Sequence, residues 1–283
     1  MQRYKILHRT YYNFSGLVTL GPHQLRLRPR EDHEMRIESS TLKITPQANL
    51  HWYRDVEGNS VANAIFDLPT SQLVIESEVI IQQYNEDPLG FLTVTHATDY
   101  PCTYHPDDQV LLSPYMVLLE QSSRKQLSHW IANIWKQNER IQTYKLLQRI
   151  GTHIYKTMSY RLREEPGVQS VEQTLSYGTG SCRDFAMLFM EAARCLGLAS
   201  RFVSGYLHAP PSGLNNGSTH AWAEVYLPST GWTGFDPTIG DIVGTDHIAV
   251  AVARLPEAVP PIAGTFIGPP GSSMDVGVWV SRC

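Results

Sequence analysis

The sequence has few of the features that mark a special class of protein. Only four cysteines occur in 283 residues, at positions 102, 182, 195 and 283, and no two of them form a Cys-x-x-Cys pair. This spacing argues against a zinc knuckle and against a dense disulfide framework. The 27 acidic and 23 basic residues nearly balance, for a net charge of −4. The chain therefore lacks the basic excess that binds nucleic acid or anionic membranes, and we expect neither partner.

Long apolar runs are also missing. No segment approaches the roughly 20 apolar residues that a bilayer-spanning helix needs. The first residues, Met-Gln-Arg-Tyr-Lys-Ile-Leu-His-Arg-Thr, lack the apolar stretch and the small-residue cleavage site of a signal peptide. We therefore expect a cytoplasmic protein.

The length of the chain favours two domains, because 283 residues exceed the usual size of one hydrophobic core. Residues 1–85 carry strand signals, residues 86–114 are rich in proline and polar residues, and helical periodicity begins after Pro114. We predict an N-terminal β domain over 1–85, a linker over 86–114 and a second domain over 115–283.

The N-terminal domain alternates in hydrophobicity with the two-residue period of strands. Residues 4–12 alternate and are rich in aromatic and β-branched side chains, and a turn over 55–59 separates two extended runs. Further strands are expected at 24–30, 35–45 and 73–81. Short strands at this spacing predict a β-sandwich or an open barrel.

The second domain begins with helices and continues with strands. Apolar residues recur at helical spacing over 127–135 and 146–154, which is typical of helices with one buried face. The strands predicted after these helices cover 201–207, 220–227, 232–235, 248–253 and, after a segment rich in proline and glycine, 276–280. Helices followed by an antiparallel sheet predict an α+β fold.

Cys182 stands where a glycine-rich turn meets an apolar helix. Ser181 is suited to cap the start of this helix, and Gly197 its end. A thiol in the first turn of a helix feels the positive end of the helix dipole, which favours the thiolate. The alternative is that Cys182 is a small buried residue, as we expect for Cys195. Cys283 is expected to be an exposed thiol.

His220 and Asp236 are the residues best placed to assist a nucleophilic thiol. His220 begins a strand after the polar loop 209–218, which we expect to border the cleft, and Asp236 follows the turn 228–231. An even loop that pairs Leu227 with Trp232 would put His220 and Asp236 on opposite faces of the hairpin. We therefore predict a loop of three or five residues, or a bulge, that brings Asp236 diagonal to His220.

Four segments in this order resemble the core of the transglutaminase-like superfamily. They are Gly178-Thr-Gly-Ser-Cys182-Arg-Asp-Phe-Ala186, Arg201-Phe-Val-Ser-Gly-Tyr206, His220-Ala-Trp-Ala-Glu-Val-Tyr226 and Trp232-Thr-Gly-Phe-Asp236-Pro-Thr238. The resemblance implies a papain-like fold and a catalytic triad of Cys182, His220 and Asp236. Residues 4–84 are similar to the β domain that precedes this core in bacterial transglutaminase-like cysteine proteases. Where papain-like enzymes carry an oxyanion-binding Gln, this chain has Ser176 and Tyr177, so we expect the oxyanion donors to be the backbone N–H of Cys182 and a second group, for which Tyr177 is a candidate.

These residues predict acyl transfer from an amide through a thioester on Cys182. His220 would protonate the departing amine, and Asp236 would orient the imidazole. Hydrolysis of a peptide, isopeptide or other amide is favoured by the family resemblance. The alternatives are a transglutaminase, in which an amine replaces water, and a binding module on the same fold that does not use the triad.

No cofactor or metal is expected. Cys182 and His220 are too few ligands for a structural zinc site. Asp241, Asp246 and His247 lack a recognised ligand spacing.

Overall fold

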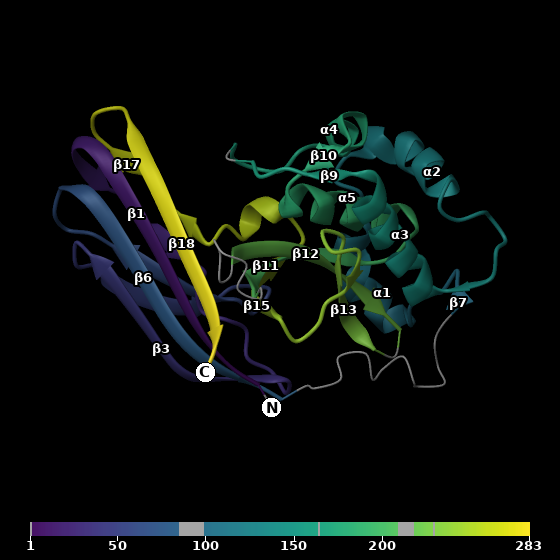
Figure 1. Cartoon of the computed structure of the whole chain (residues 1–283), viewed down its shortest axis with the longest axis horizontal. Coiled ribbons are helices and arrows are strands. Elements are labelled where there is room, and N and C mark those ends of the chain that lie inside the picture. The colour runs from purple at the N-terminus through teal and green to yellow at the C-terminus, as the bar shows by residue number, and fades with distance from the viewer. Residues whose placement is uncertain (1, 85–98, 164, 209–217, 229) are drawn as a thin grey trace.

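The computed structural model describes residues 2–84, 99–163, 165–208, 218–228 and 230–283. Strands of the first 84 residues lie at one side of the molecule, and helices packed on an antiparallel sheet lie at the other (Figure 1). Residues 86–98 of the predicted linker fall outside the described residues, as does most of the loop expected to border the cleft, 209–217.

Two sheets form the N-terminal sandwich. The larger contains β1 (Gln2–Leu20), β3 (Met35–Thr45), β6 (Thr70–Gln83), β17 (Phe266–Ile267) and β18 (Ser272–Arg282), in the order β17-β1-β6-β3, with β18 also beside β1. The smaller contains β2 (His23–Leu25), β4 (Asn49–Arg54), β5 (Ser60–Ile65) and β16 (Ile262–Ala263), in the order β16-β2-β5-β4. Side chains from both sheets share one apolar core, which includes Val18, Leu20, Leu25, Ala62, Ala64, Leu73 and Ile75. This confirms the sandwich.

The long strand β1 serves two cores. Its side chains alternate between buried and less buried positions, as a strand with one covered face requires. Val18 and Leu20 at its end pack within the sandwich, whereas Tyr4 and Ile6 at its start pack against strands of the second domain. One alternating segment therefore joins the two halves of the molecule.

The second domain is built on an antiparallel sheet of five strands. They are β11 (Ser200–Leu207), β12 (Ser218–Leu227), β13 (Gly231–Asp236), β14 (Asp241–Ile242) and β15 (His247–Ala253), in the order β14-β13-β12-β11-β15. Five helices accompany it within the described ranges: α1 (Pro106–Leu112), α2 (Arg124–Ala132), α3 (Thr143–Thr157), α4 (Val171–Tyr177) and α5 (Cys182–Cys195). The predicted α+β class is confirmed.

Short elements connect these helices and strands. Three are 3₁₀ turns: η2 (Ser113–Met116), η3 (Gln121–Ser123) and η4 (Pro256–Ala258). Two-residue strands form an antiparallel pair, β7 (Asp99–Tyr100) with β8 (Ile141–Gln142), and a parallel pair, β9 (Ser159–Tyr160) with β10 (Thr179–Gly180).

Helix α5 is the centre of the second domain. Every residue from Asp184 to Arg194 is buried, because the helix contacts the sheet through β11 and β12 and also contacts α2, α3 and α4. Arg194 and Glu191, both fully buried, form an ion pair of 3.0 Å. Arg194 also donates to the carbonyl oxygens of Ser200 and Arg254. The last turn of α5 is therefore fixed to the start of β11 and to the residue after β15.

The end of the chain differs from the predicted division. Residues 115–283 were assigned to the second domain, but β18 pairs with β1 from Phe14–Ser272 to Tyr4–Arg282. The two ends of the described chain consequently lie side by side (Figure 1). Alternation in a sequence shows which residues of a strand share a face and does not show which strand it will pair with. The remaining domain boundaries stay predictions.

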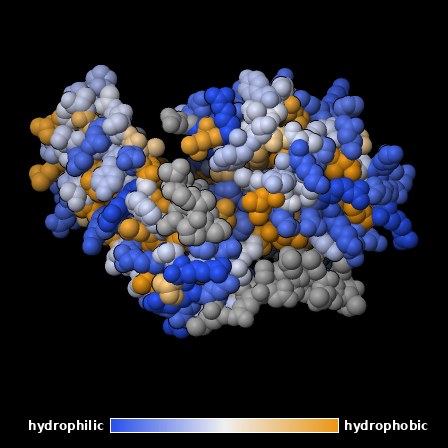
Figure 2. Space-filling model, in the orientation of Figure 1, coloured by the Kyte–Doolittle hydropathy of each residue, from blue (hydrophilic) through white to orange (hydrophobic). Residues whose placement is uncertain are grey.

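The sandwich and the second domain are in direct contact. Tyr206, Ile248 and Val250 belong to one apolar cluster with Tyr4 and Ile6 of β1. Near this cluster the side chain of Asn59 accepts from the N–H of Val252 and donates to its carbonyl, each at 2.8 Å. Beyond the contact, the surface is hollowed between the strand-rich and the helical parts (Figure 2). Among the described residues no helix combines the length and the apolar character needed to span a membrane.

Candidate active site

The thiol of Cys182 lies at the first residue of α5. Helix α4 ends at Gly178, whose φ of 61° favours glycine, and the chain then runs through β10 to Ser181. Ser181 is the N-cap, as predicted, and Gly197 follows the end of α5 with a φ of 79°. Cys182 is partly exposed, in contrast to the buried residues that follow Arg183. This position presents the thiol to the surface beside the unpaired N–H groups of a helix start.

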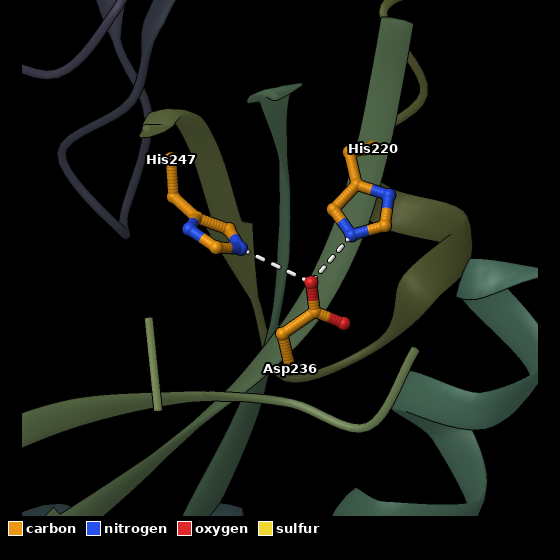
Figure 3. Close-up of side chains that lie close together, drawn as sticks. All are labelled: His220, Asp236 and His247. Atoms are coloured by element: carbon orange, nitrogen blue, oxygen red, sulfur yellow. Dashed lines mark hydrogen bonds and ion pairs between the residues drawn. The ribbon is translucent and has the colours of Figure 1, made fainter. Parts of the chain in front are cut away.

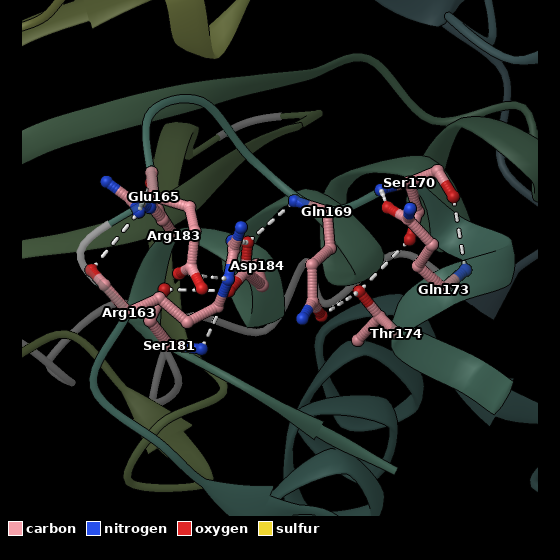
Figure 4. Close-up of polar contacts among 9 residues, drawn as sticks. All are labelled: Arg163, Glu165, Gln169, Ser170, Gln173, Thr174, Ser181, Arg183 and Asp184. Carbon is pink, nitrogen blue, oxygen red and sulfur yellow. Dashed lines mark hydrogen bonds and ion pairs between the residues drawn. The ribbon is translucent and has the colours of Figure 1, made fainter. Parts of the chain in front are cut away.

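Asp184 fixes this turn from within. Its Oδ2 accepts hydrogen bonds from the backbone N–H and the hydroxyl of Ser181, at 2.8 and 2.7 Å. Its Oδ1 accepts from Arg163 and from the backbone N–H of Gln169, both at 2.7 Å (Figure 4). Burial alone would raise the pKa of Asp184, but these hydrogen bonds lower it below its ordinary value. The carboxylate thus ties the start of α5 to the segment before α4.

The hairpin of β12 and β13 has the predicted odd loop. Leu227 pairs with Gly231, which leaves a loop of three residues, and Ala223 pairs with Phe235. This register brings Asp236 diagonal to His220, and Nε2 of His220 lies 2.7 Å from Oδ2 of Asp236. The prediction for the hairpin is confirmed.

The carboxylate of Asp236 is held where the strand ends. Pro237 follows it, and the backbone N–H of Thr238 donates to its Oδ1 at 2.8 Å. Burial alone would raise the pKa of Asp236, but hydrogen bonds from His220 and His247 lower it far below its ordinary range. A buried carboxylate so held stays ionised.

His220 lies between Asp236 and Cys182. Because Nε2 faces Asp236, Nδ1 is the nitrogen left to face Cys182, whose side chain is close enough to influence the pKa of His220. Burial alone would lower the pKa of His220, but the hydrogen bonds and charges of Asp236 and Cys182 raise it to about 10. The arrangement favours an imidazolium beside Cys182. The structure therefore brings together the three predicted residues, Cys182, His220 and Asp236.

Tyr160 is a second neighbour of the thiol. Its strand β9 pairs in parallel with β10, which places Tyr160 opposite Gly180, and its ring makes an edge contact with Phe185. Burial, together with the charge and side-chain hydrogen bond of Cys182, raises the pKa of the Tyr160 hydroxyl. No local pattern indicates this contact, because Tyr160 precedes Cys182 by 22 positions and lies in a different element.

A second histidine, His247, also reaches Asp236. Its Nε2 lies 3.0 Å from the same Oδ2 that His220 contacts (Figure 3). The backbone N–H of Gly244 donates to Nδ1 of His247 at 3.3 Å, so Nδ1 acts as an acceptor and the proton belongs on Nε2. Sequence reasoning considered His247 only as a metal ligand, because a pairing between residues 236 and 247 follows no spacing rule.

These three side chains resemble a ligand set for a metal ion. One ligand atom from each of His220, Asp236 and His247 lies within 4.8 Å of the others. However, the separations of 2.7 and 3.0 Å to Oδ2 are hydrogen-bond lengths, and the tautomer of His247 directs a proton at the carboxylate. Hydrogen bonding accounts for the cluster.

Trp222 fills the space beside the two histidines. Its ring is buried and meets that of His247 edge to face, with 5.2 Å between centroids. Gly205 admits this ring, because a Cβ at that position would lie 2.6 Å from Cη2 of Trp222 and 2.4 Å from the carbonyl oxygen of Ile248. Trp222 thus supports the site by packing.

Other residues near these segments serve the framework or lie at the surface. Glu224 pairs with Arg201 at 2.7 Å, and Tyr177 is largely exposed at the end of α4. Cys195 packs against the core but is only partly buried, and Cys283 is exposed, as expected.

Comparisons with known proteins agree with this architecture. Residues 4–82 match the bacterial transglutaminase-like N-terminal region, and residues 125–237 match the transglutaminase-like superfamily. An uncharacterized protein of Mycobacterium tuberculosis is 28% identical, with 98% of this chain and 91% of that protein covered. An uncharacterized protein of Mycobacterium leprae is 23% identical, with 100% and 99% covered.

A solved structure shares the whole fold. The crystal structure of a "putative cysteine protease" from Cytophaga hutchinsonii superimposes with a TM-score of 0.74, over 99% of this chain and 90% of that one, at 16% identity. Both the sandwich and the helix-covered sheet are therefore shared. The two matched regions, which together cover most of the chain, show that it belongs to the transglutaminase-like superfamily.

Proposed function

We propose that this protein is a cysteine-dependent acyl-transfer enzyme that cleaves an amide bond, with water as the ordinary acceptor. The observation that carries the proposal is the buried pair of His220 and Asp236, 2.7 Å apart, with the other face of His220 against the partly exposed Cys182. A structural cysteine has no need of a buried, charge-stabilised imidazole at its sulfur.

The first half of the reaction forms a thioester. The thiolate of Cys182 attacks the carbonyl carbon of the amide, and the C=O electron pair moves to oxygen. As the tetrahedral species collapses, the C–N bond breaks and Nδ1 of His220 gives its proton to the departing amine. Asp236 keeps the imidazole oriented and stabilises its charged form.

The second half releases the acyl group. Nδ1 of His220 now accepts a proton from water, whose oxygen adds to the thioester carbon. The C–S bond then breaks, a carboxylic acid leaves, and Cys182 returns to the thiolate. An amine in place of water would give a new amide, which is the transglutaminase reaction. The "putative cysteine protease" that shares the fold favours water and a peptide-like substrate.

The oxyanion of each tetrahedral species needs two donors. The backbone N–H of Cys182 is the first, since it opens α5 and has no acceptor within the helix. The hydroxyl of Tyr160 is our candidate for the second, because β9 pairs Tyr160 with Gly180, two residues before Cys182, and the Tyr160 ring contacts Phe185 of the same helix. We expect Tyr160→Phe to slow acylation of Cys182 by about 10²-fold, whereas the exposed Tyr177→Phe is the matched control and should change little.

An activated ester tests the proposal without a known substrate. Mixing p-nitrophenyl acetate with the protein should release about one equivalent of p-nitrophenolate in a burst, and mass spectrometry should find the acetyl group on Cys182. His220→Ala should slow the burst by about 10²- to 10⁴-fold. Cys195→Ala, a change at the opposite end of the same helix, should leave it intact.

The fate of the acetyl group separates the possible functions. Acetate in the presence of methylamine indicates a hydrolase, whereas N-methylacetamide as the main product indicates a transglutaminase. A burst that is unchanged in Cys182→Ala, or no burst, would refute acyl transfer and favour a binding module. A cytoplasmic location stays a separate prediction, to be tested by fractionation of cells.

A further inference from the structure

His247 forms the fourth member of the catalytic cluster, and its contact is as well defined as that of His220. Both imidazoles direct Nε2 at Oδ2 of Asp236, from 2.7 and 3.0 Å, and approach it from opposite sides (Figure 3). His247 is 8% exposed and Asp236 is fully buried, so water does not compete for this oxygen. The two histidines therefore share one carboxylate oxygen in a site of low dielectric.

The local structure fixes His247 in one orientation. It begins β15, where it pairs with Leu207 of β11, and the N–H of Gly244 donates to its Nδ1. The edge contact with Trp222 limits rotation of the ring. Because Nδ1 is used as an acceptor, Nε2 carries the proton and donates it to Asp236.

We propose that His247 is a positioning residue of the catalytic group, which holds the carboxylate of Asp236 and divides its negative charge between two imidazoles. The inference rests on the proposed function, because it concerns how readily His220 exchanges its proton. Without His247, Oδ2 would retain only one donor from the two histidines, and His220 would face the full charge of the carboxylate. The N–H of Thr238 would still hold Oδ1, so the carboxylate would stay in place.

The consequence falls on the step in which His220 acts as a base. To accept a proton from water, Nδ1 of His220 must first be unprotonated. A more negative Asp236 raises the pKa of His220 and reduces the fraction of neutral imidazole near neutral pH. The charged or titratable groups that act on His220 are Asp236 from β13 and Cys182 from α5. Cys182 in turn lies near Tyr160 of β9. In the acetylated protein Cys182 carries no charge, so the charge of Asp236 becomes the main influence on the pKa of His220.

The experiment measures hydrolysis of the acetyl group on Cys182 as a function of pH. In His247→Leu, which has no donor, the pH of half-maximal hydrolysis should rise by about one unit, and hydrolysis at pH 7 should slow by about tenfold. His247→Gln, whose amide N–H2 can reach Oδ2, should restore the native profile. His129→Leu removes an exposed histidine and is the control for the loss of a ring. An unchanged or lowered midpoint in His247→Leu would overturn the inference.

Nitrogen NMR of the ¹⁵N-histidine-labelled native protein gives a second test, which does not depend on acylation of Cys182. The signals of His247, identified by their loss in His247→Gln, should show a protonated Nε2 and an unprotonated Nδ1. The opposite tautomer would refute the donor role. If the native protein gives no acetyl-Cys182, the proposed function fails, and the tautomer still decides whether His247 donates to Asp236.

Discussion

His8 gives a quantitative test of how the sandwich is joined to the second domain. It is 1% exposed on β1, with Nδ1 at 3.0 Å from the hydroxyl of Tyr206 and Nε2 at 3.0 Å from that of Thr10. Burial lowers the pKa of His8 to about 4. The folded protein therefore holds a neutral imidazole at this contact, while the unfolded chain can protonate it.

The sign and size of the effect follow from linkage. The folded pKa lies below the unfolded value of about 6.5, so the contribution of His8 is fully present above pH 6.5 and is lost as the pH falls toward 4. Between pH 7 and pH 5 the unfolded state gains most of one proton at this residue. The free energy of unfolding should fall by about 2 kcal/mol from His8 alone.

Urea denaturation of the native protein and of His8→Gln at pH 7 and pH 5 measures this term. The variant cannot gain the proton, so its stability difference from the native protein should shrink by about 2 kcal/mol at pH 5. His33→Gln is the control, because the side chain of His33 is 90% exposed. If the difference between native protein and His8→Gln is the same at both pH values, a neutral buried His8 is refuted.

Two further substitutions test the supports of the active site. Gly205→Ala should destabilise the fold by about 1–3 kcal/mol, since the new Cβ would meet the ring of Trp222 and a backbone carbonyl; Gly244→Ala, with open space around it, should unfold at nearly the native temperature. Asp184→Ala should lower the free energy of unfolding, measured by urea denaturation, by about 3 kcal/mol. The change leaves Arg163 and the backbone N–H groups of Gln169 and Ser181 without their acceptor. Glu165→Ala, at the exposed partner of Arg163, should cost well under 1 kcal/mol, and equal losses for the two acidic residues would contradict the role of Asp184.

Local patterns predicted the parts of the fold that depend on local physics. The alternation of residues 4–12 indicated a strand with one covered face, and β1 has that pattern of burial. The parity of the hairpin required an odd loop between His220 and Asp236, and the pairing of Leu227 with Gly231 supplies it. The position of Cys182 at a helix start followed from Ser181 and the apolar periodicity after it.

Contacts between distant segments were beyond such patterns. The C-terminal strand was predicted, but its partner β1 lies at the other end of the chain. His247 reaches Asp236 because the chain returns on the far side of β11, which no spacing within 236–247 reveals. Asp184 binds Arg163 and Gln169 from an earlier segment, a contact that no pattern around Cys182 indicates. In each case the missing information was which segments meet.

The most direct test of the central claim is the alkylation rate of each cysteine by iodoacetamide at about pH 6, where few ordinary thiols are ionised. Peptide mass spectrometry would follow all four cysteines in the native protein and in His220→Ala. Cys182 should react much faster than Cys102, Cys195 and the exposed Cys283, and should lose that advantage without His220. A Cys182 that reacts no faster than Cys283 in the native protein would contradict an activated thiolate.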